Sequence, residues 1–349
     1  IKEMKKNTYK AIGLMSGTSC DGIDMVYCSF HFDKQWSYKI LTAKMVDYSP
    51  EWIRKLRNAI HLSEEELTQF DRELGTYFGK ETKQFIEENN LTEIDFIASH
   101  GHTVFHKPEK GITVQIGSGK AIKEATQISV INDFRSLDVA NGGQGAPLVP
   151  VGDKLLFSQY DYCLNIGGIA NVSYEENGTR KAYDVCFANM ILNPLANELG
   201  LPFDRDGEIA KRGNLTTQLL NELMNLDFEN NSLGYEIYEK YILPILGKYS
   251  ISNEDKITAV THYLALSITK LFSHHSSVLI TGGGAFNTFL ISLIKQNTSA
   301  NLVQANKELI EYKEALIFAF LGVLKLENTP NCLSSVTGAR KDVVGGVIV

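Results

Sequence analysis

A cluster of serine, threonine and glycine residues interrupts the first apolar stretch of the chain. Residues 11–24 have the sequence AIGLMSGTSCDGID, and a second apolar stretch follows at 25–30. Asp21 and Gly22 are typical of a tight turn, so the segment predicts a β-hairpin. An ordinary polar turn has a similar composition. Backbone N–H groups and hydroxyls at the tip can also converge on one point and bind phosphate oxygens, and the residues concerned are Ser16, Gly17, Thr18 and Ser19.

A second segment repeats this plan near the middle of the chain. Residues 161–174 have the sequence DYCLNIGGIANVSY, in which two apolar stretches flank a turn that contains Gly167 and Gly168. The turn and its flanks predict another β-hairpin. Two hairpins of one plan, one near the start of each half, suggest two lobes of similar topology.

A third glycine-rich turn lies between a predicted strand at 278–281 and a predicted helix at 288–295. Its sequence, GGGAFN at 282–287, completes the strand, glycine turn and helix unit that holds nucleotides in many proteins. Glycines in such a turn also allow a helix and a strand to pack closely. The motif alone therefore favours a nucleotide site without establishing one.

Three histidines occur in the segment SHGHTVFH, at positions 100, 102 and 106. Such a cluster could hold a metal ion, but no carboxylate or cysteine partner recurs nearby. The five cysteines are odd in number and form no C-x-x-C pair, so neither a zinc site nor a disulfide framework is indicated. The sequence predicts no metal site, and its free thiols suit a reducing cytoplasm.

Length and charge limit the classes of protein to consider. A chain of 349 residues predicts two domains, and a net charge of −7 without a basic cluster argues against nucleic acid or an anionic membrane as partner. The longest apolar stretch, 315–324, is about half a membrane span and predicts a buried helix. The basic start leads into the polar hairpin rather than an apolar core, so we expect no signal peptide and a cytoplasmic location.

The hairpins require supporting elements along the whole chain. Ser63 and Glu66 form a capping box that predicts a helix running towards residue 89. Glycine-rich residues 132–150 predict an interdomain loop. The predicted lobes are 1–137 and 138–349, with the tail 337–349 packing back on the first. Further strands are predicted at 39–46, 94–98, 111–116 and 128–131, and further helices at 120–126, 188–199, 215–224 and 257–272.

Taken together and in order, the motifs resemble a known family. GQGAPLVP and GLMSGTS in particular are similar to the anhydro-N-acetylmuramic acid kinase family, a branch of the superfamily of acetate and sugar kinases, heat-shock chaperones and actin. The resemblance covers nearly the whole chain. Its motifs are GLMSGTSCDGID at 13–24, SHGHT at 99–103, GGQGAPLVP at 142–150, LNIGGIANVS at 164–173, FDRDG at 203–207, GGGAFN at 282–287 and SVTG at 335–338.

The resemblance implies a two-lobed α/β fold, the actin-like ATPase (sugar kinase) fold, with the active site in the interdomain cleft. It implies ATP and Mg²⁺ as cofactors, the ion being carried largely by phosphates and waters, with Asp21 a candidate outer-shell partner and no direct protein ligand. The two hairpins would be phosphate loops, which agrees with the lack of a G-x-x-x-x-G-K-[ST] motif. The adenosine loop would contain Gly282, Gly283, Gly284 and Asn287.

The family opens the 1,6-anhydro ring of its sugar with water and phosphorylates the released oxygen, giving N-acetylmuramic acid 6-phosphate and ADP in cell-wall recycling. The resemblance places the catalytic base at Asp184, within YDVCFANM. Cys186, Phe187 and Ala188 replace the glycine-rich middle of the family segment. An isolated aspartate here would ordinarily cap the helix that begins near Ala188.

The resemblance also suggests the residues that bind the sugar. One of them is Glu314, for which a solvated helix face in 308–326 is the ordinary explanation. His102 stands where the family commonly has Gln, and both side chains offer a donor and an acceptor, so we expect a tolerated exchange. The suggested residues are Thr103, Gln144, Gly145 and Glu314.

Two other functions remain open at the level of sequence. One is a kinase for another amino sugar, in which Asp184 would deprotonate a free hydroxyl. The other is an actin-like ATPase module whose product is a conformational signal. In the preferred interpretation the partner is a small amino sugar, and we include a homodimer among the assemblies to test.

Overall fold

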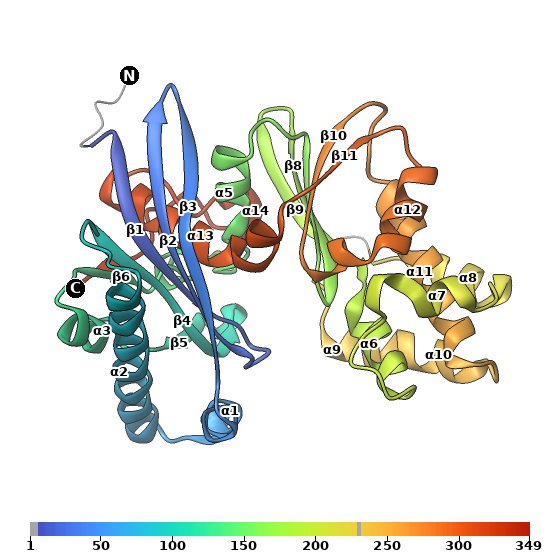
Figure 1. Cartoon of the computed structure of the whole chain (residues 1–349), viewed down its shortest axis with the longest axis horizontal. Helices are drawn as coiled ribbons and strands as arrows, with labels where there is room; N and C mark the ends of the chain where they lie inside the picture. Colours follow the sequence, from blue (N-terminus) through green and yellow to red (C-terminus); the bar gives the residue numbers. More distant parts are fainter. Residues whose placement is uncertain (1–5, 229–231) are drawn as a thin grey trace. The chain divides into compact units, whose positions relative to one another are not determined.

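The computed structural model describes residues 6–228 and 232–349. The chain divides into two compact units (Figure 1), of which unit 1 comprises residues up to 156 and 312–349, and unit 2 comprises 157–311. The predicted boundary at 137/138 is therefore corrected to 156/157, and the chain returns to unit 1 at 312 rather than at 337. The reason is that 138–156 and the long C-terminal helix make long-range contacts within unit 1, as described below.

The sheet of unit 1 has the strand order β12-β6-β4-β1-β2-β3, and β5 pairs with β4. β1 is antiparallel to β2 and parallel to β4, which is in turn parallel to β6. The strands are β1 (Thr8–Ser16), β2 (Gly22–Asp33), β3 (Gln35–Asp47), β4 (Phe96–Lys107), β5 (Ile112–Ile116), β6 (Val130–Asn132) and β12 (Val347–Ile348).

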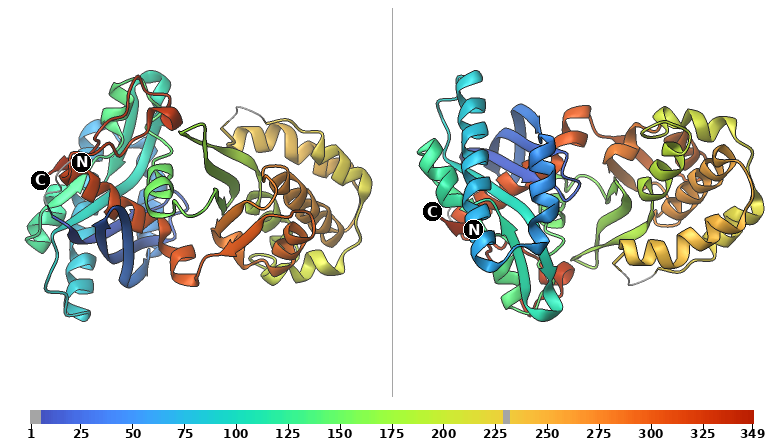
Figure 2. Two further views of the ribbon diagram at one scale, coloured as in Figure 1. Left: turned by 90° about the horizontal axis from the view of Figure 1, so that it is seen from above. Right: turned by 90° about the horizontal axis from the view of Figure 1, so that it is seen from below.

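Helices cover both faces of this sheet (Figure 2). Successive side chains of β1 point to opposite faces, so the strand packs against both helical layers. Ile12 and Leu14 join a buried cluster with Phe78 of α2. On the other face, a Cβ added to Gly13 would lie 2.0 Å from the carbonyl oxygen of Ala315, so α13 approaches β1 backbone to backbone. The helices of unit 1 are α1 (Pro50–Asn58), α2 (Glu64–Glu88), α3 (Gly119–Thr126), α4 (Ser136–Ala140), α5 (Val149–Leu156), α13 (Lys307–Leu326, which belongs to unit 1 from residue 312 on) and α14 (Ser334–Thr337), with short 3-10 turns η1 (Ala59–His61) and η2 (Pro108–Lys110).

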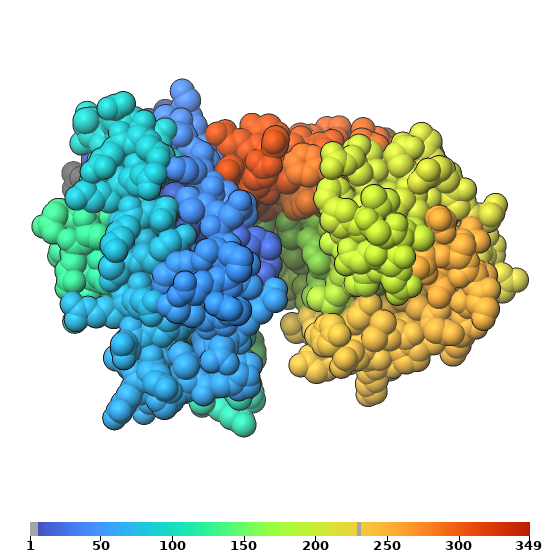
Figure 3. All heavy atoms as spheres, turned by 60° about the horizontal axis from the view of Figure 1, so that its bottom comes forward, coloured from blue at the N-terminus to red at the C-terminus, as the bar shows by residue number. Residues whose placement is uncertain are grey.

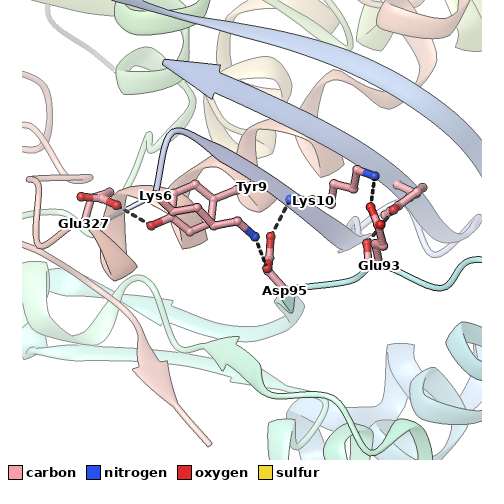
Figure 4. Close-up of polar contacts among 7 residues, drawn as sticks. Lys6, Tyr9, Lys10, Glu93, Asp95 and Glu327 are labelled. Carbon is pink, nitrogen blue, oxygen red and sulfur yellow. Dashed lines mark hydrogen bonds and ion pairs between the residues drawn. The ribbon is translucent and has the colours of Figure 1, made fainter. Parts of the chain in front are cut away.

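Polar contacts hold the first half of β1 to its neighbours (Figure 4). The Tyr9 hydroxyl donates to the carboxylate of Glu327 at the end of α13, and both side chains are buried. The Lys10 backbone N–H donates to Asp95 at 2.8 Å, and Lys6 pairs with the same carboxylate at 2.6 Å. The strand that carries the first hairpin is therefore anchored to α13 and to the segment before β4.

Unit 2 contains a sheet of order β11-β10-β7-β8-β9. β7 is antiparallel to β8 and parallel to β10, so this order and these directions match β6-β4-β1-β2-β3 of unit 1. The prediction of an α/β fold with two lobes of similar topology is confirmed. The strands are β7 (Tyr162–Ile166), β8 (Ile169–Glu176), β9 (Thr179–Phe187), β10 (Ser277–Thr281) and β11 (Asn301–Gln304).

A helical layer packs against this second sheet around α11, which contacts α6, α7, α8 and α12. In Figure 3 the yellow-green and yellow segments that contain α8 and α10 form much of the visible surface of unit 2. The elements are α6 (Asn189–Asn197), η3 (Arg205–Gly207), α7 (Glu208–Arg212), α8 (Thr217–Met224), α9 (Tyr235–Ile237), the π-turn η4 (Tyr238–Ile242), α10 (Leu243–Lys248), α11 (Asn253–Thr269), η5 (Gly283–Phe286) and α12 (Thr288–Gln296).

The capping box predicted at the start of α2 is present. The Ser63 hydroxyl accepts from the Glu66 N–H, and the Glu66 carboxylate accepts from the Ser63 N–H at 2.8 Å. We expect Ser63→Ala to lower the free energy of unfolding by about 1 kcal/mol, the usual effect of losing an N-cap, without changing kcat. Urea unfolding monitored by circular dichroism measures this. Ser37→Ala, which removes an exposed serine hydroxyl on β3, is the control, and equal losses in both variants would contradict the assignment.

Candidate active site

The tip of the first hairpin lies between β1 and β2. Thr18 and Ser19 are exposed, and Cys20 closes the turn by donating its N–H to the Gly17 carbonyl at 3.1 Å. Ser16 differs from them because its side chain is only 1% exposed. Its hydroxyl oxygen accepts from the Tyr48 hydroxyl at 2.7 Å and lies 2.9 Å from His102 Nδ1. The hydroxyls at this tip therefore divide into two that face solvent and one that belongs to a buried network.

Gly17 has room for a side chain within unit 1. A Cβ at this position would meet only the Ser19 hydroxyl oxygen, at 3.5 Å, whereas a Cβ at Gly22 would lie 2.3 Å from the Val46 carbonyl oxygen. Gly22 is therefore required by the packing of β2 against β3, but Gly17 is not. A glycine without such a requirement fits a place where a ligand approaches the backbone closely.

The segment SHGHT lies inside β4, which extends to Lys107 rather than ending near 98 as predicted. The reason is that β5 pairs with the second half of the strand, with a register shift between Thr103 and Phe105. Thr103 is half-buried and accepts a long hydrogen bond of 3.4 Å from the Gln115 amide. Its hydroxyl is thus only weakly engaged by the protein.

His100, which is buried, and Arg135, which is half-buried, form a polar pair beside this strand. Guanidinium groups only donate, so His100 Nε2 accepts from Arg135 Nε at 3.0 Å, and the ring proton lies on Nδ1, 2.9 Å from the Gly101 carbonyl oxygen. Burial, reinforced by the charge of Arg135, lowers the pKa of His100 to about 3. The ring is neutral at pH 7 and acts as a fixed acceptor.

The segment 132–150 is not the interdomain loop that its glycines suggested. It contains α4, and the buried carboxylate of Asp138 accepts from the Gly145 N–H and from the Thr337 hydroxyl, each at 2.8 Å. Arg135 donates to the Gly145 carbonyl oxygen at 2.6 Å. The Gln144 N–H donates to the Thr337 carbonyl oxygen at 2.7 Å, while the Gln144 side chain is exposed. The contacts of Gly145 thus hold the loop in place, and the loop exposes the Gln144 side chain to solvent.

We expect Thr337→Val to lower the free energy of unfolding by roughly 2 kcal/mol. The variant leaves a buried carboxylate without one of its donors, and hydrogen bonds to charged groups contribute about 1.5–3 kcal/mol. Thr337→Ser keeps the hydroxyl and should restore most of the stability, which chemical denaturation measures. Equal losses in the two variants would show that the methyl packing matters and the hydrogen bond does not.

Glu314 is exposed on α13, although its neighbours along the helix are buried. Lys313 pairs with Asp153 at 2.7 Å inside unit 1. The surrounding protein raises the pKa of Glu314, and the positive charges of Arg135 and Lys313 oppose that rise. The exposure of Glu314 agrees with both interpretations of the sequence, a solvated helix face and a ligand-binding group.

The turn of the second hairpin in unit 2 is joined to the start of α6. The Gly168 carbonyl oxygen accepts from Ala188 and Met190, at 2.8 and 3.0 Å, and the Gly167 carbonyl oxygen accepts from Asn189 at 3.2 Å. Their own N–H groups are different, because only Gly167 donates within the described chain, to the Ile169 carbonyl oxygen at 3.3 Å. The carbonyl groups of the turn are thus bonded to the start of α6, and the Gly168 N–H is left for a contact such as that to a phosphate.

Asp184 lies within β9, opposite Asn171 of β8. The side chain is half-buried, and its Oδ2 accepts from the Leu233 N–H at 2.9 Å. Burial raises the pKa of this carboxyl, and the Leu233 hydrogen bond partly opposes the rise. The alternative of a helix cap is wrong, since no side chain caps the start of α6. A held carboxylate with a raised pKa has the properties of a general base.

The three glycines that begin GGGAFN have different structural requirements. Gly282 has a φ of +81°, and a Cβ at Gly284 would lie 2.3 Å from Ile166 Cγ2, so both are needed for the turn itself. A Cβ at Gly283 would meet nothing within 4 Å. Asn287 caps α12, because its Oδ1 accepts from the Leu290 N–H at 2.9 Å. Gly283 is thus the position at which space is left for a ligand.

Beside Gly283 lies a pocket of about 270 Å³ within unit 2. Two aromatic side chains on its wall, Phe203 and Phe286, are 45% and 39% exposed. Asp204 anchors the FDRDG segment by accepting from the Ile209 and Ala210 N–H groups, at 2.8 and 3.0 Å. Flat apolar walls with a few polar groups suit a nucleoside. The wall also contains Asn189, Leu192, Asn193, Asp206, Gly284 and Asn287.

Sequence reasoning missed several residues that shape these regions. Tyr48 follows β3, outside every motif that the sequence singled out, and Asp138 and Arg135 lie in the segment 132–150 that predicted an interdomain loop. No local pattern could have identified them, because their partners are distant in the chain. Within residues 6–228 and 232–349, no group of three His, Cys, Asp or Glu side chains is arranged to hold a metal ion, and no helix is long and apolar enough to cross a membrane.

Comparison with known proteins places the chain in a family. A family model described as anhydro-N-acetylmuramic acid kinase matches residues 9–349. Proteins of that name from Mannheimia succiniciproducens and Bacillus cereus (strain AH187) are 33% and 32% identical, covering 99% and 96% of this chain and 99% and 97% of their own lengths. A solved ROK family glucokinase from Streptomyces griseus, in complex with glucose and AMPPNP, is a remote likeness with 11% identity, a TM-score of 0.39 and coverage of 89% and 98%. The chain belongs to the anhydro-N-acetylmuramic acid kinase family.

Proposed function

We propose that this protein is an ATP-dependent kinase that opens the 1,6-anhydro ring of anhydro-N-acetylmuramic acid with water and phosphorylates the 6-oxygen. The products are N-acetylmuramic acid 6-phosphate and ADP. Family membership over residues 9–349 supports the substrate. The observation that carries the chemistry is the half-buried carboxylate of Asp184, held through one oxygen by the Leu233 N–H.

The base acts on water in this reaction. The 6-oxygen of the anhydro-sugar is part of an acetal and has no proton to lose, so a base is useful only at the nucleophile. Asp184 accepts a proton from water while the water oxygen bonds to the anomeric carbon. The bond between the anomeric carbon and the 6-oxygen breaks at the same time. That oxygen bonds to the γ-phosphorus, and ADP leaves with the electrons of the broken bond.

ATP is held by backbone groups and a pocket rather than by a lysine-bearing loop. We assign the phosphates to the first hairpin tip, Ser16 to Ser19, and to the turn at Gly167 and Gly168. Adenosine is assigned to the pocket beside Gly283. The exposed carboxylate of Asp21 fits an outer-shell contact to Mg²⁺ carried by the phosphates, where the ion would neutralise developing charge.

The sugar is assigned to polar groups of unit 1. Thr103 is weakly engaged, and the side chains of Gln144 and Glu314 are exposed, so all three can bind hydroxyl or acetamido groups. Gly145 supports Gln144 through the contacts of its backbone. We further propose a cytoplasmic location, which the five free cysteines suit, and a homodimer, which light scattering of the purified protein tests.

Isotope labelling tests the proposed chemistry. In ¹⁸O-water with ATP and the anhydro-sugar, mass spectrometry should find label at the anomeric carbon of the product and none in its phosphate. Label in the phosphate would mean that water attacks phosphorus, and the mechanism would be abandoned. Consumption of ATP with the ring-opened sugar alone would favour the free-hydroxyl kinase, and ATP hydrolysis without sugar would favour the ATPase module.

A further inference from the structure

His102 lies between two candidate ligand-binding segments, the tip of the first hairpin and Thr103 of β4. In the parallel pairing of β1 with β4, Ser16 at the base of the first hairpin tip lies opposite His102. The next residue along β4 is Thr103. The His102 side chain is 3% exposed, and its Nδ1 lies 2.9 Å from the Ser16 hydroxyl oxygen. His102 is thus in direct contact with the residue at the base of the hairpin tip.

The hydroxyls determine which ring nitrogen carries the proton. Tyr48 donates its proton to the Ser16 oxygen at 2.7 Å. With Tyr48 as the donor of that pair, the Ser16 proton needs another acceptor, and the other side-chain atom that its hydroxyl reaches within the described chain is His102 Nδ1. If Nδ1 were protonated instead, the hydroxyl proton of the buried Ser16 would be left without a partner, which costs free energy. The chain of donors therefore runs from Tyr48 through Ser16 to His102, and the ring proton lies on Nε2.

The two buried histidines of β4 thus have opposite tautomers. His100 is protonated on Nδ1 and accepts at Nε2 from Arg135. His102 accepts at Nδ1 and has its N–H at Nε2, which bonds to no group in residues 6–228 and 232–349. Burial lowers the pKa of His102 to about 4, so the ring stays neutral and the donor stays fixed at physiological pH.

We propose that the Nε2–H group of His102 is a substrate-binding donor, which gives a hydrogen bond to an acceptor oxygen of the bound sugar or of the ATP phosphates. The inference rests on the proposed function, because that function places ligands at the hairpin tip and Thr103. The Tyr48–Ser16 pair has the role of positioning this donor. The Ser16 hydroxyl accordingly acts on His102, so the phosphate contacts assigned to Ser16 to Ser19 come from the backbone and from the Thr18 and Ser19 hydroxyls.

Nuclear magnetic resonance of the ¹⁵N-histidine-labelled full chain tests the tautomer and the ligand. We expect His102 to be protonated on Nε2, and its Nε2 resonance to shift on saturation with the anhydro-sugar alone or with AMPPNP alone. The ligand that produces the shift identifies the source of the oxygen. A proton on Nδ1, or no shift with either ligand at saturation, would overturn the proposal.

His31 provides a matched control. It makes the same kind of imidazole to hydroxyl contact, with Thr8 at 2.8 Å, but it is exposed and lies opposite the start of β1. Its resonances should not respond to either ligand, and His31→Leu should keep wild-type kinetics. A response equal to that of His102 would indicate a general change of the protein and would count against a specific donor.

Kinetics of variants separate binding from folding. We expect His102→Leu to raise the KM of the responding substrate roughly tenfold with a smaller change in kcat, the size of one lost hydrogen bond. His102→Gln keeps an amide donor and should stay within about threefold of wild type. If His102→Gln is as impaired as His102→Leu, or both substrates lose affinity equally in a destabilised protein, the role is structural. An active wild type with an unresponsive His102 overturns this inference alone.

Discussion

Replacing Asp184 with Asn is expected to lower kcat by about 100-fold or more, with ATP affinity little changed. Asn preserves the size of the side chain, and its carbonyl oxygen can still accept from the Leu233 N–H. It removes basicity, and losses on the order of 10²-fold or more are typical when a general base is removed. Steady-state kinetics with the anhydro-sugar and calorimetric titration of AMPPNP measure the two effects. Glu176→Gln, a like change at an exposed carboxylate on β8, should be silent.

We expect the same residue to set the acid limb of the pH profile. Burial raises the pKa of Asp184, so the base becomes protonated at a higher pH than a free aspartate would. A base acts in its proton-free form, so we expect kcat to fall as pH decreases through this raised pKa. The residual rate of Asp184→Asn should lack that limb. An Asp184→Asn enzyme that keeps wild-type turnover, or the wild-type acid limb, would remove Asp184 from the role of base.

Replacing Gly17 with Val is expected to lower kcat/KM for ATP by roughly 100-fold without unfolding the protein. A Cβ here meets only the Ser19 hydroxyl oxygen at 3.5 Å, so unit 1 can accept the side chain. A valine would instead occupy space at the tip where a phosphate must approach the backbone. ATP titration and steady-state kinetics measure the loss, and thermal unfolding verifies that the variant is folded.

Substitutions at two other glycines are controls for this result. Gly247 on α10 has nothing within 4 Å of an added Cβ, and α10 packs against η4 and α8, which contain no assigned residue, so Gly247→Val should keep wild-type ATP kinetics. At Gly13 a Cβ would lie 2.0 Å from the Ala315 carbonyl oxygen, so Gly13→Val should fail to fold stably. A folded Gly17→Val enzyme with wild-type ATP affinity and turnover would falsify the phosphate assignment of the first hairpin.

Local patterns determined the elements whose causes are local. The capping box of Ser63 and Glu66 was visible in the sequence because both of its hydrogen bonds join residues three apart. The two hairpins followed from a turn between apolar strands, and their common plan predicted two units of one topology, which the matching strand orders confirm. The ordered motifs predicted the family, because a motif set of this length is specific even where each turn is ambiguous.

Tertiary structure decided what depends on distant partners. Asp138 and Thr337 are 199 residues apart, and their contact turns a glycine-rich segment that resembled a linker into a fixed loop of unit 1. The same cause moved the boundary to 156/157, since contacts rather than composition define a compact unit. Glycine identity alone could not show that Gly13 is required by packing while Gly17 is not. The proton on His102 was likewise undetermined by sequence, because the hydroxyls that fix it come from β1 and from the segment after β3.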